Sequence, residues 1–271
     1  MTAPDATLLR HRIFLTAGTL LIIGTYVYLV FLRPEGLPEG SGIASVVSLV
    51  GNTLGAILLL AGVIHRLPMT TVVLIPSAIA LNIVIGHITS WLGIPLYLDS
   101  LGTVLVAALA GPAAGVAAGV LANVVWGMTI APVAVAFAAV AALTGALAGY
   151  MVRAGLFKKL WLVPLGGAVT GILTALVAAP IAAFAFGGVT GGGATAVVAA
   201  FRAMGTGLLQ ATTLQGLLFD PLDKAIMFTV AALVVMSIPR RLLHQFPFAA
   251  AHLTTSKQTP AGPLRAPVRP E

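Results

Sequence analysis

The chain has 271 residues, of which 59% are hydrophobic and 8% charged, whereas a soluble domain carries about 25% charged residues. This composition excludes an ordinary soluble globular protein and indicates an all-α polytopic membrane protein. The formal net charge of +7 does not indicate nucleic-acid binding, because the cations lie in short clusters that flank apolar runs, as in cytoplasmic loops. The absence of cysteine excludes disulfides, thiolate metal ligands and cysteine nucleophiles.

Two apolar runs near the N-terminus, residues 14–32 and 43–64, are each long enough to span a bilayer. Arg10 and Arg12 precede the first run and Arg66 follows the second, which predicts a cytoplasmic N-terminus. No small-residue cleavage pattern follows the first run, so a retained helix is favoured, and a cleaved signal peptide is the alternative. The Pro- and Gly-rich segment 33–42 predicts a loop. Residues 1–66 are therefore interpreted as an N-terminal helical pair.

Six further spans are predicted in a core of residues 67–246: 70–92, 97–110, 113–130, 132–152, 162–186 and 222–238. The run 97–110 would be about 21 Å long, short of a bilayer core of roughly 30 Å. It must be shielded by its neighbours, and the loop before it lies partly inside the protein.

The run 194–215 is interpreted as a re-entrant or surface helix on the outer side. If it crossed the membrane, Arg240 and Arg241 after the last span would lie outside, which the positive-inside rule disfavours. Arg202, Gln210 and Gln215 would also suit a lipid-facing span poorly. The result is eight spans, both termini cytoplasmic, in the cell (plasma) membrane, followed by a disordered proline-rich tail over 247–271.

Two acid-bearing clusters are the main candidates for a binding site. Asp99 stands alone between two apolar segments, which is costly unless it faces protein or a polar cavity. Asp220, Asp223 and Lys224 lie in the segment FDPLDKA, on the same predicted outer side. The alternative for this second cluster is helix capping, with Pro221 near a helix start and both acids in the first turn.

Other polar and aromatic residues complete the predicted pocket. Asn123 lies about one helical turn before Trp126, so both can share a face, although Asn123, like Asn52 and Asn82, can also tie helices together. Tyr97 can equally be an interfacial anchor. The predicted pocket residues are Tyr97, Asp99, Ser100, Asn123, Trp126, Asp220, Asp223 and Lys224.

A stripe of small residues follows the first cluster: Gly111, Ala114, Gly115, Ala118 and Gly119. Such a stripe lets another helix approach closely. It serves either packing within the chain or docking of a partner subunit.

Catalytic and nucleotide motifs are absent from the sequence. It contains no GxxxxGK[ST], HExxH or GxSxG pattern, so ATP hydrolysis by a phosphate loop is excluded and no enzymatic activity is expected. No clustered His set is present, and neither a metal nor a cofactor is expected.

Residues 68–245 resemble the substrate-binding S components of energy-coupling factor (ECF) vitamin transporters. The resemblance rests on IPLYLDSLGTVLVAALAGPAAG at 94–115, on a small-residue helix that reaches Asn123, and on a late DPLDKA followed by PRR after the last span. The order of six core helices also agrees.

The resemblance implies a six-helix bundle that captures a vitamin or related small water-soluble molecule from outside, beneath the loop 93–100. Such a subunit works with a membrane coupling (T) subunit and two ATPase subunits as an ABC importer. The sequence departs from the family in its extra pair 14–64 and in the lack of an AxxxA pattern in 70–92. Thr2 stands where nickel and cobalt members carry His, so metal transport is not expected.

Two other functions remain open at this point. One is a membrane sensor domain that binds a similar ligand without moving it. The other is a proton-coupled secondary transporter that uses Asp99 and His87.

Overall fold

The computed structural model describes residues 3–32 and 43–253, and all regular elements in these ranges are helices. Within these ranges six helical segments are long and apolar enough to cross a membrane, fewer than the eight spans predicted from the sequence. Large aliphatic side chains cover their outer faces, as at Val73 and Val169, which are 67% and 51% exposed. The chain is therefore a multi-span membrane protein. The six segments are Leu9–Phe31, Ile43–Arg66, Met69–Trp91, Pro112–Thr129, Pro132–Arg153 and Leu160–Phe184.

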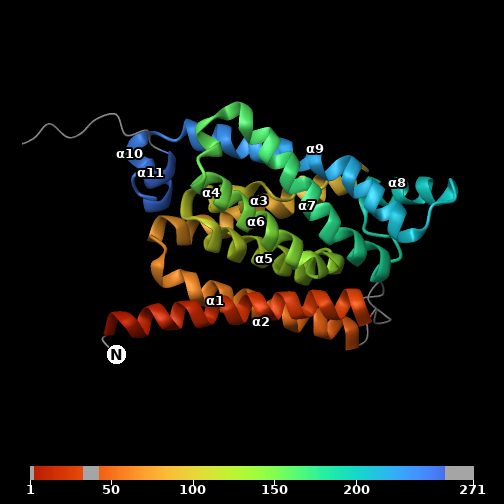
Figure 1. Ribbon diagram of the computed structural model, residues 1–271, viewed down its shortest axis with the longest axis horizontal. Helices are drawn as coiled ribbons and strands as arrows, with labels where there is room; N and C mark the ends of the chain where they lie inside the picture. Colours follow the sequence, from red (N-terminus) through yellow and green to blue (C-terminus); the bar gives the residue numbers. More distant parts are fainter. Residues whose placement is uncertain (1–2, 33–42, 254–271) are drawn as a thin grey trace, which may run out of the picture.

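The N-terminal pair consists of α1 (Ala3–Val27) and α2 (Ile43–Val63). The two helices lie side by side along one edge of the molecule (Figure 1). They approach at Gly55, where an added Cβ would crowd the Ile22 side chain. Leu59 and Ile22 then join one apolar cluster with Val120 and Val124 of α5 (Pro112–Thr129). The two expected N-terminal helices are thus present, packed on the rest of the bundle.

The short helix α4 (Leu101–Ala110) is enclosed by its neighbours, as expected from its length. Contrary to the sequence prediction, it begins at Leu101 and not at Tyr97, so residues 93–100 form a longer irregular segment. Asn82 of α3 (Met69–Trp91) fixes this start, because its Oδ1 accepts from the Gly102 N–H at 2.6 Å and its Nδ2 donates to Thr103 Oγ1 at 2.8 Å. Asn82 therefore ties α3 to α4. Asn52 does not tie helices in this way, since its Nδ2 donates to Ser48 O within α2.

The predicted helices 194–215 and 222–238 are wrong in their boundaries. The structure has a short α8 (Gly192–Ala203) and one continuous 30-residue α9 (Leu208–Ser237) that passes through Pro221. Pro221 removes one backbone donor but does not end the helix, which buried membrane helices tolerate. At 1.5 Å per residue α9 is about 45 Å long. Asp220 and Asp223 therefore lie in mid-helix, and the capping interpretation is wrong.

Glycines of α7 (Val163–Phe184) hold the charged part of α9 in place. A Cβ on Gly167 or Gly171 would overlap the backbone of α9 at Lys224 or Asp220, respectively. This spacing of four residues brings two helix backbones together. It explains why α7 and α9 run closely paired in Figure 1.

The small-residue stripe of α5 is buried within the chain. A Cβ on Gly115 or Gly119 would press on Gly145 O or Ala141 O of α6 (Ala138–Arg153). Ala114 and Ala118 are each 1% exposed, and Gly111 lies under the Phe248 ring. These residues therefore pack helices together, and their burial does not fit the partner-docking interpretation.

The predicted disordered tail is ordered over its first residues. After α10 (Arg240–Leu243), α11 (Pro247–Leu253) packs on α4 and α6, and Ala249 is fully buried. The expected loop over 33–42, the tail beyond residue 253 and Thr2 lie outside the described residues.

Positive charge gathers at one end of the bundle, where the N-terminus, α10 and α11 lie (Figure 1). Eight of the ten Lys and Arg residues in the described ranges lie toward this end, in or beside the terminal parts of helices. The other two are Lys224 in mid-α9 and Arg202 in α8, at the opposite end. The eight are Arg10, Arg12, Arg66, Arg153, Lys158, Lys159, Arg240 and Arg241.

Candidate ligand-binding site

A cavity of about 210 Å³ lies toward the end of the bundle opposite this cation-rich end. Its walls come from the C-terminal parts of α3, α5 and α7, from the start of α6 and from α9. The irregular segment 93–100 and the loop before α8 complete it. The volume is somewhat below the roughly 300–1,000 Å³ of sites for drug-sized ligands, so the cavity suits a compact molecule.

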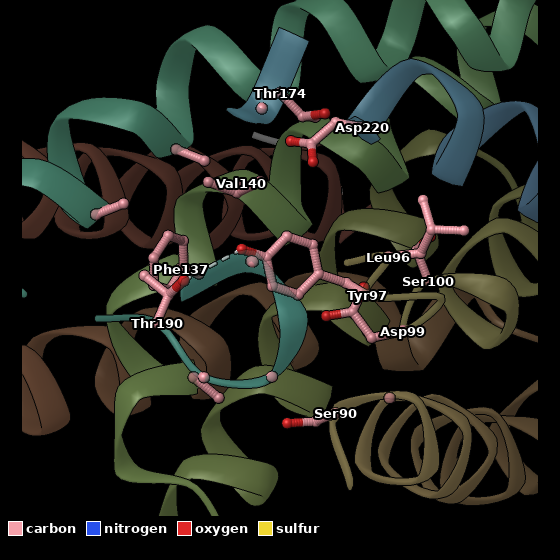
Figure 2. Close-up of a pocket in the computed structure, with 18 of the residues that line it drawn as sticks. Ser90, Leu96, Tyr97, Asp99, Ser100, Phe137, Val140, Thr174, Thr190 and Asp220 are labelled. Atoms are coloured by element: carbon pink, nitrogen blue, oxygen red, sulfur yellow. Dashed lines mark hydrogen bonds between the residues drawn. The ribbon is translucent and has the colours of Figure 1, made fainter. Parts of the chain in front are cut away.

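The segment 93–100 is held in place by hydrogen bonds to three other elements. Thr89 Oγ1 of α3 donates to Tyr97 O at 2.8 Å, and the Leu98 N–H donates to Asp223 Oδ1 of α9 at 2.6 Å. The Tyr97 hydroxyl and Thr190 Oγ1 lie 3.3 Å apart (Figure 2). Leu98 has a positive φ of 49°, a strained conformation for a residue with a branched side chain. The hydrogen bond from the Leu98 N–H to Asp223 helps to hold this backbone conformation.

Four charged groups meet where this segment contacts α9. Lys224 Nζ lies 2.5 Å from Asp223 Oδ2 and 3.7 Å from Asp99 Oδ1. Asp223 is fully buried, with both carboxylate oxygens in hydrogen bonds. Asp220 is 6% exposed, and its Oδ1 has no hydrogen-bond partner among the described residues. Withdrawal from water raises the pKa of Asp99, which lies outside the candidate spans, while Lys224 acts against this shift.

The structure brings the two predicted acid clusters together at this one cavity. Seven of the eight predicted pocket residues line it, namely Tyr97, Asp99, Ser100, Asn123, Trp126, Asp220 and Lys224. Asp223 is not among the lining residues. It accepts hydrogen bonds from the Lys224 Nζ and the Leu98 N–H. Figure 2 shows Tyr97, Asp99 and Asp220 around this cavity, with the Tyr97 hydroxyl directed toward Thr190.

Asn123 and Trp126 share the cavity wall, as their spacing predicted. Asn123 also donates from Nδ2 to Ala134 O at 3.1 Å, so it fixes the segment before α6 as well. Gly86 of α3 lets Trp126 and Asp99 approach, because an added Cβ would lie 2.6 Å from the Trp126 ring and 2.8 Å from Asp99 Cβ.

Several lining residues were not in the predicted pocket: Gln215, Thr174, Thr190, Phe137 and Val140. Gln215 could have been found from its spacing: Thr212, Asp220 and Lys224 lie at multiples of four residues on one face of a continuous helix, and Gln215 follows Thr212 by three. The sequence predicts a helix break before Pro221, which separates Gln215 from Lys224, so this shared face was not predicted. The other four residues lie in segments far apart in the sequence, so no local sequence pattern could group them.

Two residues considered from the sequence, His87 and Arg202, lie away from the cavity walls. His87 is exposed on α3. Arg202 is exposed on α8, where its Nη1 donates to Thr206 O at 2.8 Å. Lys224 is therefore the only cationic side chain among the lining residues.

The fold and the cavity define a multi-span, all-helical membrane protein with a polar site inside its bundle. No protein-family model, curated protein or solved structure matches the chain.

Proposed function

We propose that this protein is the substrate-capture subunit of an ECF-type ABC importer, which binds a vitamin or related small nutrient from outside the cell. The observation that carries the proposal is the cavity itself. It is compact, lies inside a helical bundle, and is lined by residues with buried polar atoms that have no partner in the described part of the chain. Such groups favour a bound molecule that satisfies them. The role in substrate capture for an importer is inferred from the resemblance of residues 68–245 to S components.

The charge distribution supports capture from the outer side. The end rich in Lys and Arg belongs in the cytoplasm by the positive-inside rule. The cavity then lies toward the outer surface of the plasma membrane, with both chain termini in the cytoplasm. The segment 93–100 and the start of α8 cover it: a Cβ on Gly193 would overlap Gly93 O, so these two backbones touch.

Uptake would need partners, because the sequence carries no phosphate-binding loop. We infer a membrane coupling subunit and two ATPase subunits, with the present chain acting in binding and not in catalysis. Since the small-residue stripe of α5 is buried, the surface that meets the coupling subunit would lie elsewhere.

A proton-coupled secondary transporter based on Asp99 and His87 is less well supported. Asp99 lines the cavity, whereas His87 is exposed on α3 and is not among the lining residues. A proton relay needs groups linked by hydrogen bonds or water, and no hydrogen bond joins these two in the described chain.

The test begins with small molecules that co-purify with the protein, identified by mass spectrometry and compared with those from a Trp126→Ala variant. The identified molecule should bind to the purified chain without ATP, and vesicles that contain the chain alone should not accumulate it. Accumulation driven by a proton gradient would establish secondary transport instead. Binding that never supports uptake with the coupling and ATPase subunits present would favour a sensor.

A further inference from the structure

Four buried polar atoms that have no hydrogen-bond partner among the described residues belong to side chains that line the same cavity. They are Ser100 Oγ, Trp126 Nε1, Gln215 Nε2 and Asp220 Oδ1. Ser100, Gln215 and Asp220 are each 6% exposed. An unsatisfied buried polar group costs about 1–3 kcal/mol. A molecule in this cavity should therefore offer hydrogen-bond donors to Asp220 and acceptors to Trp126 and Gln215.

The charges around the cavity do not balance within the protein. Lys224 is held by Asp223, whose second oxygen is taken by the Leu98 N–H. Asp99 contacts Lys224 less closely, with its Oδ1 3.7 Å from the Lys224 Nζ. Asp220 has no ion pair in the described chain. With the carboxylates ionised, three acids and one lysine sum to −2. Such an excess is costly in a low-dielectric interior, and a positively charged ligand would offset it.

The remaining lining favours an organic cation over a metal ion. Tyr97, Trp126 and Phe137 are all lining residues, and aromatic faces attract organic cations. Much of the rest of the wall is alanine, valine and threonine methyl groups. Within the described ranges no group of three or more His, Cys, Asp and Glu residues could hold a metal ion.

We propose that the cavity binds a compact organic cation, an ammonium or protonated nitrogen heterocycle, with its charged nitrogen at Asp99 and Asp220 and its apolar part against the aromatic wall. This proposal rests on the proposed capture function and names its substrate class. Lys224 stays with Asp223. Asp99, 3.7 Å from Lys224, and Asp220, without an ion pair in the described chain, are then the two acids open to the ligand.

Three probes that share one ring test the charge: benzylammonium, benzyl alcohol and benzoate. Each is titrated into the purified full chain while tryptophan fluorescence and thermal unfolding are followed. Benzylammonium should bind at least about tenfold more tightly than benzyl alcohol, as expected for one charge-assisted hydrogen bond, and benzoate should not bind. Asp99→Asn and Asp220→Asn should each weaken benzylammonium binding about tenfold and leave benzyl alcohol binding unchanged.

Arg202→Gln is the matched control, because it changes an exposed charge outside the cavity and should leave all three affinities unchanged. The proposal is overturned if benzylammonium does not bind, if benzyl alcohol or benzoate binds as tightly, or if benzylammonium binding survives in both acid variants. Benzyl alcohol or benzoate that binds as tightly as benzylammonium, and whose binding Trp126→Ala abolishes, would refute the cationic class and leave the capture function standing. The capture function is tested separately, by the uptake experiments above and by the orientation of the chain in the membrane.

Discussion

At the scale of single residues, Asp220 and Asp223 show that neighbouring acids in one sequence segment can have different roles. Three positions apart, they lie on nearly the same side of α9. Asp223 is fully buried and bonded through both oxygens. Asp220 lines the cavity and keeps one oxygen unpaired. Asp223 thus serves the fold, and Asp220 is available to a ligand.

This difference predicts opposite effects on stability. Asp223→Asn removes the charge that balances buried Lys224 and should lower the free energy of unfolding by about 3 kcal/mol or more. Asp220→Asn removes an unpaired charge beside other acids and should leave stability unchanged or raise it. Thermal unfolding in detergent without ligand measures both. Equal loss of stability in the two variants would contradict the assignment of separate roles.

At the scale of helices, the apolar runs predicted most elements, and the misplaced boundaries have physical causes. Pro221 was interpreted as a helix start because proline fits the first turn. In α9 it lies in mid-helix, because the tight contact with α7 fixes the backbone there. Similarly, α11 could not be predicted from its proline-rich surroundings, since Phe248 and Ala249 are held by tertiary contacts with α4 and α6.

The contact between α7 and α9 can be tested at Gly171. Gly171→Leu places a side chain against the backbone of Asp220 and Pro221. Such overpacking should cost about 1–3 kcal/mol of stability or more, and it should weaken ligand binding because Asp220 moves. Gly24→Leu in α1 is the matched control, since nothing lies within 4 Å of a Cβ added there. If both variants unfold at the same temperature, the glycine contact does not fix α9.

At the scale of the whole molecule, the sequence located both acid clusters at one end of the helices but could not show that they meet. Asp99 and Asp223 are 124 positions apart, and their meeting depends on the irregular segment 93–100 turning inward to reach α9. That turn includes the positive φ of Leu98, a conformation that leucine rarely adopts alone. The long-range contact imposes it, so no local pattern could predict it.

The orientation of the whole molecule is the last prediction, and the cysteine-free chain allows a direct test because each introduced cysteine is the only thiol. Met204 follows α8 near the cavity end and is 69% exposed. Gln245 is exposed beside α10 at the cation-rich end. If this end is cytoplasmic, Met204→Cys should react with an impermeant maleimide on intact cells, whereas Gln245→Cys should react only after permeabilisation. Leu233→Cys, in the last part of α9 and 50% exposed, should face lipid and resist both treatments, because the thiolate that reacts does not form there. Labelling of Gln245→Cys on intact cells would place the cavity on the cytoplasmic side, and capture of a nutrient from outside would then be impossible in this orientation.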